Sequence, residues 1–183
     1  QGLFCDLNGK FPNHHPDPSK PENVEDLIKS VAKNNSDIGL AFDGDADRLG
    51  VISSSGEMIF PDMQMILFSE HILKKNPNSK IVFDVKCSKL LEESILKFKG
   101  TPIMSKTGHT FIKGMIRENS AILGGEMSGH IFFNDRWPGF DDGVYAGARM
   151  LEILSEYEGE DIFNALPKLI STPEINLKTT DEE

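Results

Sequence analysis

The sequence contains little cysteine, no long apolar run and no excess of positive charge. Its two cysteines, Cys5 and Cys87, fit no zinc-ligand spacing, and a chain of 183 residues does not need a disulfide to fold. Reduced thiols in a cytoplasmic protein are therefore the better interpretation.

The charge and hydropathy of the chain exclude several classes of partner. A net charge of −10 disfavours non-specific binding to nucleic acid or anionic lipid, because phosphates repel an acidic surface. No apolar stretch reaches the roughly 20 residues of a membrane-spanning helix. The first residues lack the basic and apolar regions of a signal peptide. We expect a folded, cytoplasmic protein that binds small molecules rather than nucleic acid or membranes.

The first third of the chain predicts a small α/β unit. Residues 2–7 are apolar enough for a short strand, and four prolines make residues 11–21 a loop. Pro21 is suited to the first turn of a helix, and an apolar stripe follows it. Residues 37–42 predict a buried strand, and residues 49–60 predict a hairpin.

From residue 61 onward, the pattern alternates between helices and short apolar strands. Such alternation is typical of a mixed, mostly parallel sheet with helices on both faces. The predicted helices cover residues 62–76, 88–99, 109–119 and 141–157, and the predicted strands cover residues 80–85, 101–106, 121–126 and 130–134.

These patterns predict two α/β domains and a linker. Residues 1–56 read as the end of a partial α/β domain, and residues 57–172 read as a complete one. Residues 173–183 are expected to be a linker toward a further domain. Because the chain lacks an initiator Met and opens on an expected strand, we expect it to be a segment of a longer protein.

Three aspartates at alternate positions, Asp43, Asp45 and Asp47, follow the strand predicted over residues 37–42. On a backbone that is still extended, their side chains would point the same way and repel one another. A hard divalent cation such as Mg²⁺ would remove that repulsion. Arg48 adds a guanidinium suited to binding a phosphate, so the motif predicts a site for a metal and a phosphoryl group.

Three alternatives compete for this acidic motif. An EF-hand loop is excluded, because Arg48 and Ser54 replace the required Gly and Glu. A phosphatase of the haloacid-dehalogenase type also carries D-x-D after an apolar strand, and residues 140–142 could supply its distant acidic pair. That reading is weaker, since Asp47 and Arg48 stand where such enzymes usually have a threonine and an apolar residue. A solvated acidic turn is the purely structural alternative.

A second motif, "LGGEMSGH" at residues 123–130, ends another predicted strand. Its glycines let the backbone approach a ligand, while Glu126 and Ser128 could bind sugar hydroxyls. An ordinary glycine-rich turn remains an alternative. The motif is not a P-loop, because His130 and Ile131 replace the required Lys and Ser or Thr.

A third motif, "SKTGHTFIK" at residues 105–113, places Lys106 and His109 where a strand passes into a helix. Thr107 or Gly108 is expected to cap that helix, and helix N-termini attract anions. Each cation alone is more often a surface residue. Open α/β sheets bind ligands at the carboxyl ends of their strands, so we expect the three motifs to form one site.

Four motifs in this order and spacing resemble those of the α-D-phosphohexomutases, most closely the bacterial phosphomannomutase/phosphoglucomutase group. They are "FDGDADR", "KTGH", "GEMSGH" and "RWPGFDDG". The segments "FPNHHPDPSKPEN" and "STPEI" extend the resemblance over almost the whole chain.

The resemblance implies a segment comprising the end of domain 2 and all of domain 3 of a four-domain isomerase. Such an enzyme interconverts hexose 1-phosphate and hexose 6-phosphate through a phosphoserine and a 1,6-bisphosphate intermediate. The implied partners are hexose phosphates, with glucose or mannose as the sugar, and the remaining domains of the same chain. A non-catalytic metal or sugar-phosphate binding module is a further alternative.

The same resemblance assigns roles to residues. A histidine or a lysine is expected to act as general acid/base. The implied metal ligands for Mg²⁺ are Asp43, Asp45 and Asp47; the implied sugar-binding residues are Glu126 and Ser128; and the implied catalytic residues are Arg48, Lys106, His109 and His130.

Two parts of the implied enzyme have no counterpart in the chain. It contains no phosphoserine loop of the "TASHNP" kind and no C-terminal phosphate-clamp domain. We therefore expect the segment alone to lack mutase activity.

Overall fold

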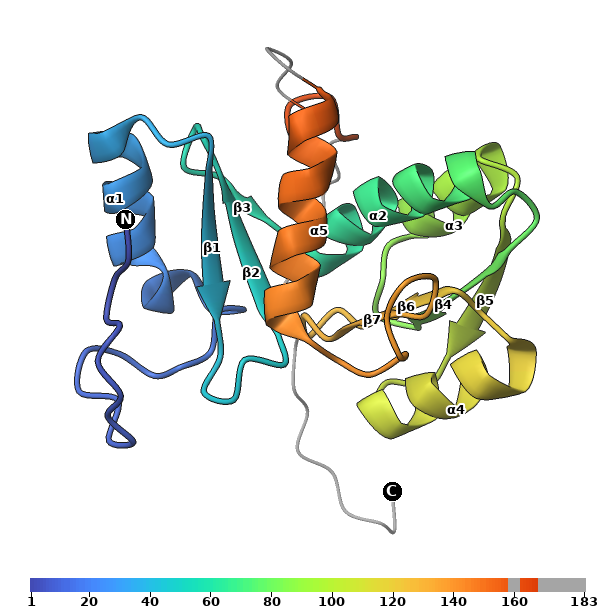
Figure 1. Ribbon diagram of the computed structural model, residues 1–183, viewed down its shortest axis with the longest axis horizontal. Coiled ribbons are helices and arrows are strands. Elements are labelled where there is room, and N and C mark those ends of the chain that lie inside the picture. The colour runs from blue at the N-terminus through green and yellow to red at the C-terminus, as the bar shows by residue number, and fades with distance from the viewer. Residues whose placement is uncertain (158–161, 168–183) are drawn as a thin grey trace, which may run out of the picture.

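Two β-sheets organise the protein (Figure 1). The computed structural model describes residues 1–157 and 162–167. The linker predicted over residues 173–183 and the "STPEI" segment lie outside the described residues.

The first sheet is antiparallel and has the order β1-β2-β3. Helix α1 packs against it through Leu27 and Val31, which form a small apolar cluster with Ile52 and with Val24, the residue before the helix. The helix ends at Asn34, and Asn35 caps it in a left-handed conformation. The elements are a 3₁₀ helix at Pro21–Asn23, α1 at Glu25–Asn34, β1 at Ile38–Phe42, β2 at Leu49–Ser53 and β3 at Met58–Ile59.

The second sheet is the mixed, mostly parallel sheet that the sequence predicts. Its order is β5-β4-β6-β7, with β4 parallel to β5 and β6, and β7 antiparallel to β6. The strands are β4 at Lys80–Asp84, β5 at Thr101–Ser105, β6 at Leu123–Gly125 and β7 at Ile131–Phe133.

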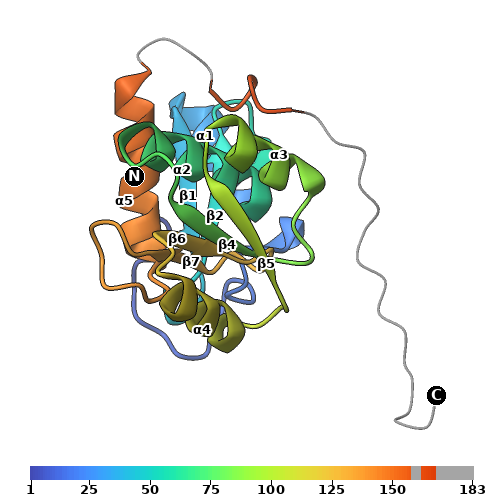
Figure 2. The ribbon, with the colours of Figure 1, turned by 90° about the vertical axis from the view of Figure 1, so that its right-hand side faces the viewer.

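Helices cover both faces of this sheet, as predicted (Figure 2). Ile81 and Phe83 of β4 join the core formed with α2 and α3, whereas Val82 points the opposite way and packs against α4. The helices are α2 at Pro61–Lys75, α3 at Lys89–Lys97, α4 at His109–Asn119 and α5 at Gly143–Glu156.

Helix α5 stands between the two sheets (Figure 1). It contacts β1 and β2 as well as β7 and α2. Leu49 and Val51 of β2 belong to the same apolar core as Met150 of α5. Packing therefore continues across the boundary predicted at residue 56, and that boundary stays a prediction.

The strand predicted over residues 2–7 is wrong. These residues pair with no strand, Phe4 has a left-handed φ of 53°, and Leu7 is fully exposed. An apolar run forms a strand only where a sheet edge can accept its hydrogen bonds. Within the described residues, no helix is both long and apolar enough to cross a membrane.

Candidate active site

The acidic motif forms a tight turn after β1 rather than a continued strand. One carboxylate oxygen of Asp43, Oδ1, accepts the backbone N–H groups of Asp47 at 3.0 Å and Arg48 at 3.1 Å. Ala46 takes a left-handed φ of 61° inside the turn. The extended backbone expected from the sequence is therefore wrong. The expected convergence is nevertheless present, because ligand atoms of Asp43, Asp45 and Asp47 all lie within 4.8 Å of one another.

Carboxylates hold Arg48 in place beside this turn. Its Nε donates to Asp43 Oδ2 at 2.7 Å, and its Nη1 donates to Asp17 Oδ1 at 3.3 Å. Asp17 lies in the proline-rich loop and is fixed by hydrogen bonds from Ser19. Sequence reasoning missed Asp17, because the contact joins residues that are far apart in the chain.

The turn carries more negative charge than its own cation balances. Burial opposes ionisation of Asp43, but hydrogen bonds from Arg48 outweigh it and lower the pKa of that carboxyl. For Asp47, burial and the neighbouring carboxylates of Asp43 and Asp45 raise the pKa. A divalent cation at the turn would stabilise the ionised carboxylate of Asp47 against both its burial and its acidic neighbours. The donor set therefore fits a hard metal such as Mg²⁺.

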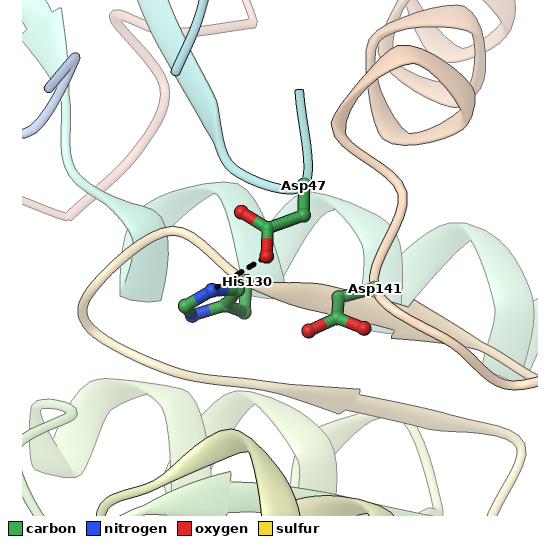
Figure 3. A group of neighbouring side chains, drawn as sticks. All are labelled: Asp47, His130 and Asp141. Carbon is green, nitrogen blue, oxygen red and sulfur yellow. Dashed lines mark ion pairs between the residues drawn. The ribbon is translucent and has the colours of Figure 1, made fainter. Parts of the chain in front are cut away.

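A backbone bridge joins the acidic turn to the glycine-rich motif. Arg48 and His130 form an isolated antiparallel bridge, and Leu49 N–H donates to Gly129 C=O at 3.2 Å. As a result, His130 Nε2 lies 3.3 Å from Asp47 Oδ2 (Figure 3). Residues more than 80 positions apart thus belong to one site.

Glu126, Ser128 and His130 interact with one another. His130 Nδ1 lies 2.9 Å from Ser128 Oγ and 3.2 Å from Glu126 Oε2. Burial lowers the pKa of His130, but Glu126, Asp47 and Asp141 outweigh it and raise the pKa. Only 2% of Glu126 is exposed, and its other oxygen accepts the N–H of Gly108. Its role in sugar binding stays a prediction.

The third motif reaches the same site through His109. The His109 ring stacks on His130 with centroids 5.7 Å apart, whereas Lys106 Nζ lies over the Phe111 ring. Gly108 caps α4, as one of the two options predicted, but Thr107 does not. Its hydroxyl donates instead to Asp84, 23 residues earlier.

Asp141 completes the site and was not among the predicted site residues. Its Oδ1 forms an ion pair with Lys113 Nζ at 2.7 Å, and its Oδ2 lies 3.8 Å from His109 Nδ1. One oxygen of Asp141 lies within 4.8 Å of ligand atoms of Asp47 and His130 (Figure 3). Asp141 lies in the motif "RWPGFDDG". From the sequence alone, it was considered only as part of the distant acidic pair of a haloacid-dehalogenase-type phosphatase.

Comparison with known proteins identifies one family for this chain. Residues 60–171 match the family described as phosphoglucomutase/phosphomannomutase, alpha/beta/alpha domain III, and residues 2–56 match domain II of that family.

Individual relatives are similar over almost the whole chain. A phosphoglucomutase of Neisseria meningitidis is 56% identical over 96% of the chain, and a phosphomannomutase/phosphoglucomutase of Pseudomonas aeruginosa is 52% identical over 98% of it. A crystal structure of a phosphoglucomutase/phosphomannomutase family protein from Burkholderia thailandensis superimposes with a TM-score of 0.90 at 51% identity, over 93% of this chain and 38% of that one. The chain spans 38–39% of the length of the two curated relatives.

The fold, the joined motifs and these similarities lead to one assignment. The chain belongs to the phosphoglucomutase/phosphomannomutase family, and its residues 60–171 and 2–56 match that family's domains III and II.

Proposed function

We propose that the full-length protein is an isomerase that interconverts hexose 1-phosphate and hexose 6-phosphate through a phosphoserine and a 1,6-bisphosphate. The observation that carries this proposal is the 3.3 Å approach of His130 to Asp47, since it joins the acidic turn to the glycine-rich motif. A phosphoryl group at the acidic turn would therefore lie beside groups suited to a sugar. Positioning and charge neutralisation are what phosphoryl transfer requires.

Asp43, Asp45 and Asp47 are the proposed ligands of Mg²⁺. Their oxygens are the hard donors that Mg²⁺ prefers, and they lie close enough together to share one ion. When bound, the ion would offset negative charge on the transferring phosphoryl group. Arg48, fixed by Asp43, would present its guanidinium to the same group.

Glu126 and Ser128 are the proposed sugar-binding residues, since a carboxylate and a hydroxyl can bind adjacent sugar hydroxyls. Lys106 and His109, at the start of α4, would attract phosphate oxygens. The phosphoserine and a phosphate-binding clamp would come from the rest of the longer chain.

A general acid/base is also needed to move the proton of the accepting hydroxyl. His130 fits that role, because the surrounding carboxylates raise its pKa and keep it charged closer to neutral pH. His109 and Lys106 are further candidates for the same proton.

The test uses the full-length protein and a coupled assay for conversion of glucose 1-phosphate to glucose 6-phosphate. We expect the parent protein to show Mg²⁺-dependent turnover and to bind Mg²⁺ in calorimetry. The variants Asp43→Asn and Asp47→Asn should lose both properties. Asp37→Asn, an exposed carboxylate just before β1, is the matched control and should keep both. Undiminished turnover in either loop variant would refute the proposed metal site, and absence of turnover in the parent protein would refute the function.

A parallel measurement of released inorganic phosphate separates the mutase from the phosphatase alternative. A haloacid-dehalogenase-type enzyme would release inorganic phosphate from hexose phosphates, whereas a mutase conserves the ester. The family match supports the mutase. We also propose a cytoplasmic location, in keeping with the free thiols of Cys5 and Cys87.

A further inference from the structure

A buried carboxylate, Asp84, lies at the centre of the sheet edge that carries the site. It is the last residue of β4, and β4 lies between β5 and β6 in the second sheet. Its exposed fraction is 0%. The loops that follow β5 and β6 carry the "KTGH" and "GEMSGH" motifs, so Asp84 stands between them.

The two carboxylate oxygens of Asp84 bind different loops. Oδ2 accepts the hydroxyl of Thr107 at 3.1 Å, from the loop after β5. Oδ1 accepts the backbone N–H of Met127 at 3.4 Å, from the loop after β6, and the thiol of Cys87 at 3.2 Å. Burial and the Asp84 carboxylate raise the pKa of Cys87, so the thiol keeps the proton that it donates.

A second carboxylate links the same two loops closer to the site. Glu126, which directly precedes Met127, accepts the N–H of Gly108, which directly follows Thr107. The same Glu126 lies 3.2 Å from His130. The separation of the two loops therefore depends on two buried acidic side chains, and only Glu126 belongs to the predicted sugar-binding set.

We propose that Asp84 is a positioning residue for the site, because it ties the Thr107 loop to the Met127 loop and so sets the distance between His109 and His130. This inference deepens the proposed function and rests on it. Asp84 is not a catalytic residue, since it acts through the loops that it joins. Hydrogen bonds in a buried environment are strong, and losing one partner leaves the others unsatisfied.

Three substitutions in the full-length protein test this role. Asp84→Ala removes both ties, and we expect kcat to fall about 100-fold, as a displacement of about 1 Å in a catalytic group can cause. Asp84→Asn should restore most of the rate, because its oxygen can accept from Met127 N–H while its amide donates to the Thr107 oxygen. Thr107→Val cuts one tie only and should lose less than Asp84→Ala.

Asp62→Ala is the matched control. Asp62 is also a buried carboxylate, 5% exposed, and it accepts the N–H groups of Met63 and Ser88 rather than those of the two loops. We expect this variant to lose thermal stability and to keep its kcat. If it lost kcat as Asp84→Ala does, the effect would be general destabilisation and the inference would be wrong.

Amide hydrogen exchange supplies a readout that does not need activity. Gly108 and Met127 should lose protection in Asp84→Ala, regain it in Asp84→Asn and keep it in Asp62→Ala. Unchanged protection in Asp84→Ala would overturn the positioning role whatever the enzyme does. An inactive parent protein whose amides respond as described would instead refute the proposed function and leave the positioning role supported. If Asp84→Ala does not fold, kcat and amide protection in Thr107→Val and Asp84→Asn test the positioning role instead.

Discussion

Single side chains in this protein act through contacts that join distant parts of the chain. Arg48 is held by Asp43 within its own turn and by Asp17 from the proline-rich loop. The two carboxylates restrain the guanidinium from different directions. Its orientation at the acidic turn therefore depends on the loop that precedes α1.

The first prediction concerns Asp17. In Asp17→Ala, Arg48 loses one charged hydrogen bond, and such bonds contribute about 1.5–3 kcal/mol. We expect kcat/KM of the full-length protein for glucose 1-phosphate to fall roughly tenfold. The coupled assay measures it, with Asp6→Ala, an exposed carboxylate of the same segment, as the control. Equal rates for the two variants would argue against the restraint.

The second prediction concerns the Asp135–Arg149 ion pair. Two hydrogen bonds, of 2.8 and 3.0 Å, join these mostly buried side chains, and Arg149 also stacks on the Phe133 ring. Burial opposes ionisation of Asp135, but hydrogen bonds and charge from Arg149 outweigh it and hold the pKa of that carboxyl below its usual value. A lowered pKa stabilises the fold above the unfolded value of about 3.9, and this stability is lost as the pH falls through the folded value.

Asp135→Asn should therefore destabilise the protein by about 2 kcal/mol near neutral pH, and the difference from wild type should shrink below about pH 4. Urea unfolding at several pH values measures it. Glu118→Gln, an exposed carboxylate of α4, should show little difference at any of them. A gap between wild type and Asp135→Asn that stays constant with pH would contradict the ion-pair explanation.

Sequence patterns predicted candidate site residues that the structure brings together, but they did not predict the partners that hold those residues in place. The acidic motif is short, since Asp43, Asp45, Asp47 and Arg48 all lie within residues 43–48. Its chemistry could therefore be predicted from the local sequence. Asp17, Asp84 and Asp141 enter the site through contacts across 23 or more positions. Such contacts depend on how the strands are ordered, and a motif carries no information about that order.

Among the elements, helix α5 begins in direct contact with the acidic turn. Gly143 N–H donates to Ala46 C=O at 2.9 Å. A Cβ on Gly143 would lie 2.6 Å from the carbonyl oxygen of Arg48 and 2.9 Å from that of Ala46. Backbone atoms on both sides leave no room for a side chain.

The third prediction follows from this approach. Gly143→Ala should displace the acidic turn or the helix, and overpacking of this kind costs about 1–3 kcal/mol. We expect a lower melting temperature and weaker Mg²⁺ binding in calorimetry. Gly114→Ala is the control, because a Cβ in the middle of α4 meets no atom within 4 Å. That variant should be about 0.5–1 kcal/mol more stable than wild type. Mg²⁺ affinity retained in Gly143→Ala would refute the constraint.

Most helices and strands could be predicted because their apolar periods are clear. Strand β4 and helix α4 lie within a residue or two of their predicted bounds. Residues 2–7 show the limit of such patterns. Their apolar side chains suit a strand, but in the described structure they pair with no strand. The turn at Asp43 was missed for another reason, since its carboxylate binds the backbone and bends it away from the strand.

At the scale of the whole molecule, the two sheets share one core, which joins Leu49 and Val51 to Met150 and Phe83. The sequence predicted a mixed, mostly parallel sheet, and this is confirmed. It did not predict the strand order or the bridge between Arg48 and His130, because pairing between distant segments leaves no local periodicity.

The fourth prediction concerns the 183-residue segment itself. It contains the acidic turn and the glycine-rich motif, but no phosphoserine loop of the family's kind. We expect no conversion of glucose 1-phosphate by the segment alone, together with measurable Mg²⁺ binding. The coupled assay and calorimetry on the purified segment check this. Full turnover by the segment would show that the proposed division of labour is wrong.

The bridge between Arg48 and His130 also restricts how far the two loops that it joins can move apart. A backbone pairing joins the acidic turn to the glycine-rich loop. Neither segment can therefore move away from the other without breaking the hydrogen bond between Leu49 and Gly129. In the proposed function, a 1,6-bisphosphate reorients between two transfer steps, and the space for that movement would have to lie outside these two loops. In a full-length protein of the proposed kind, we expect any hinge to lie outside the paired loops.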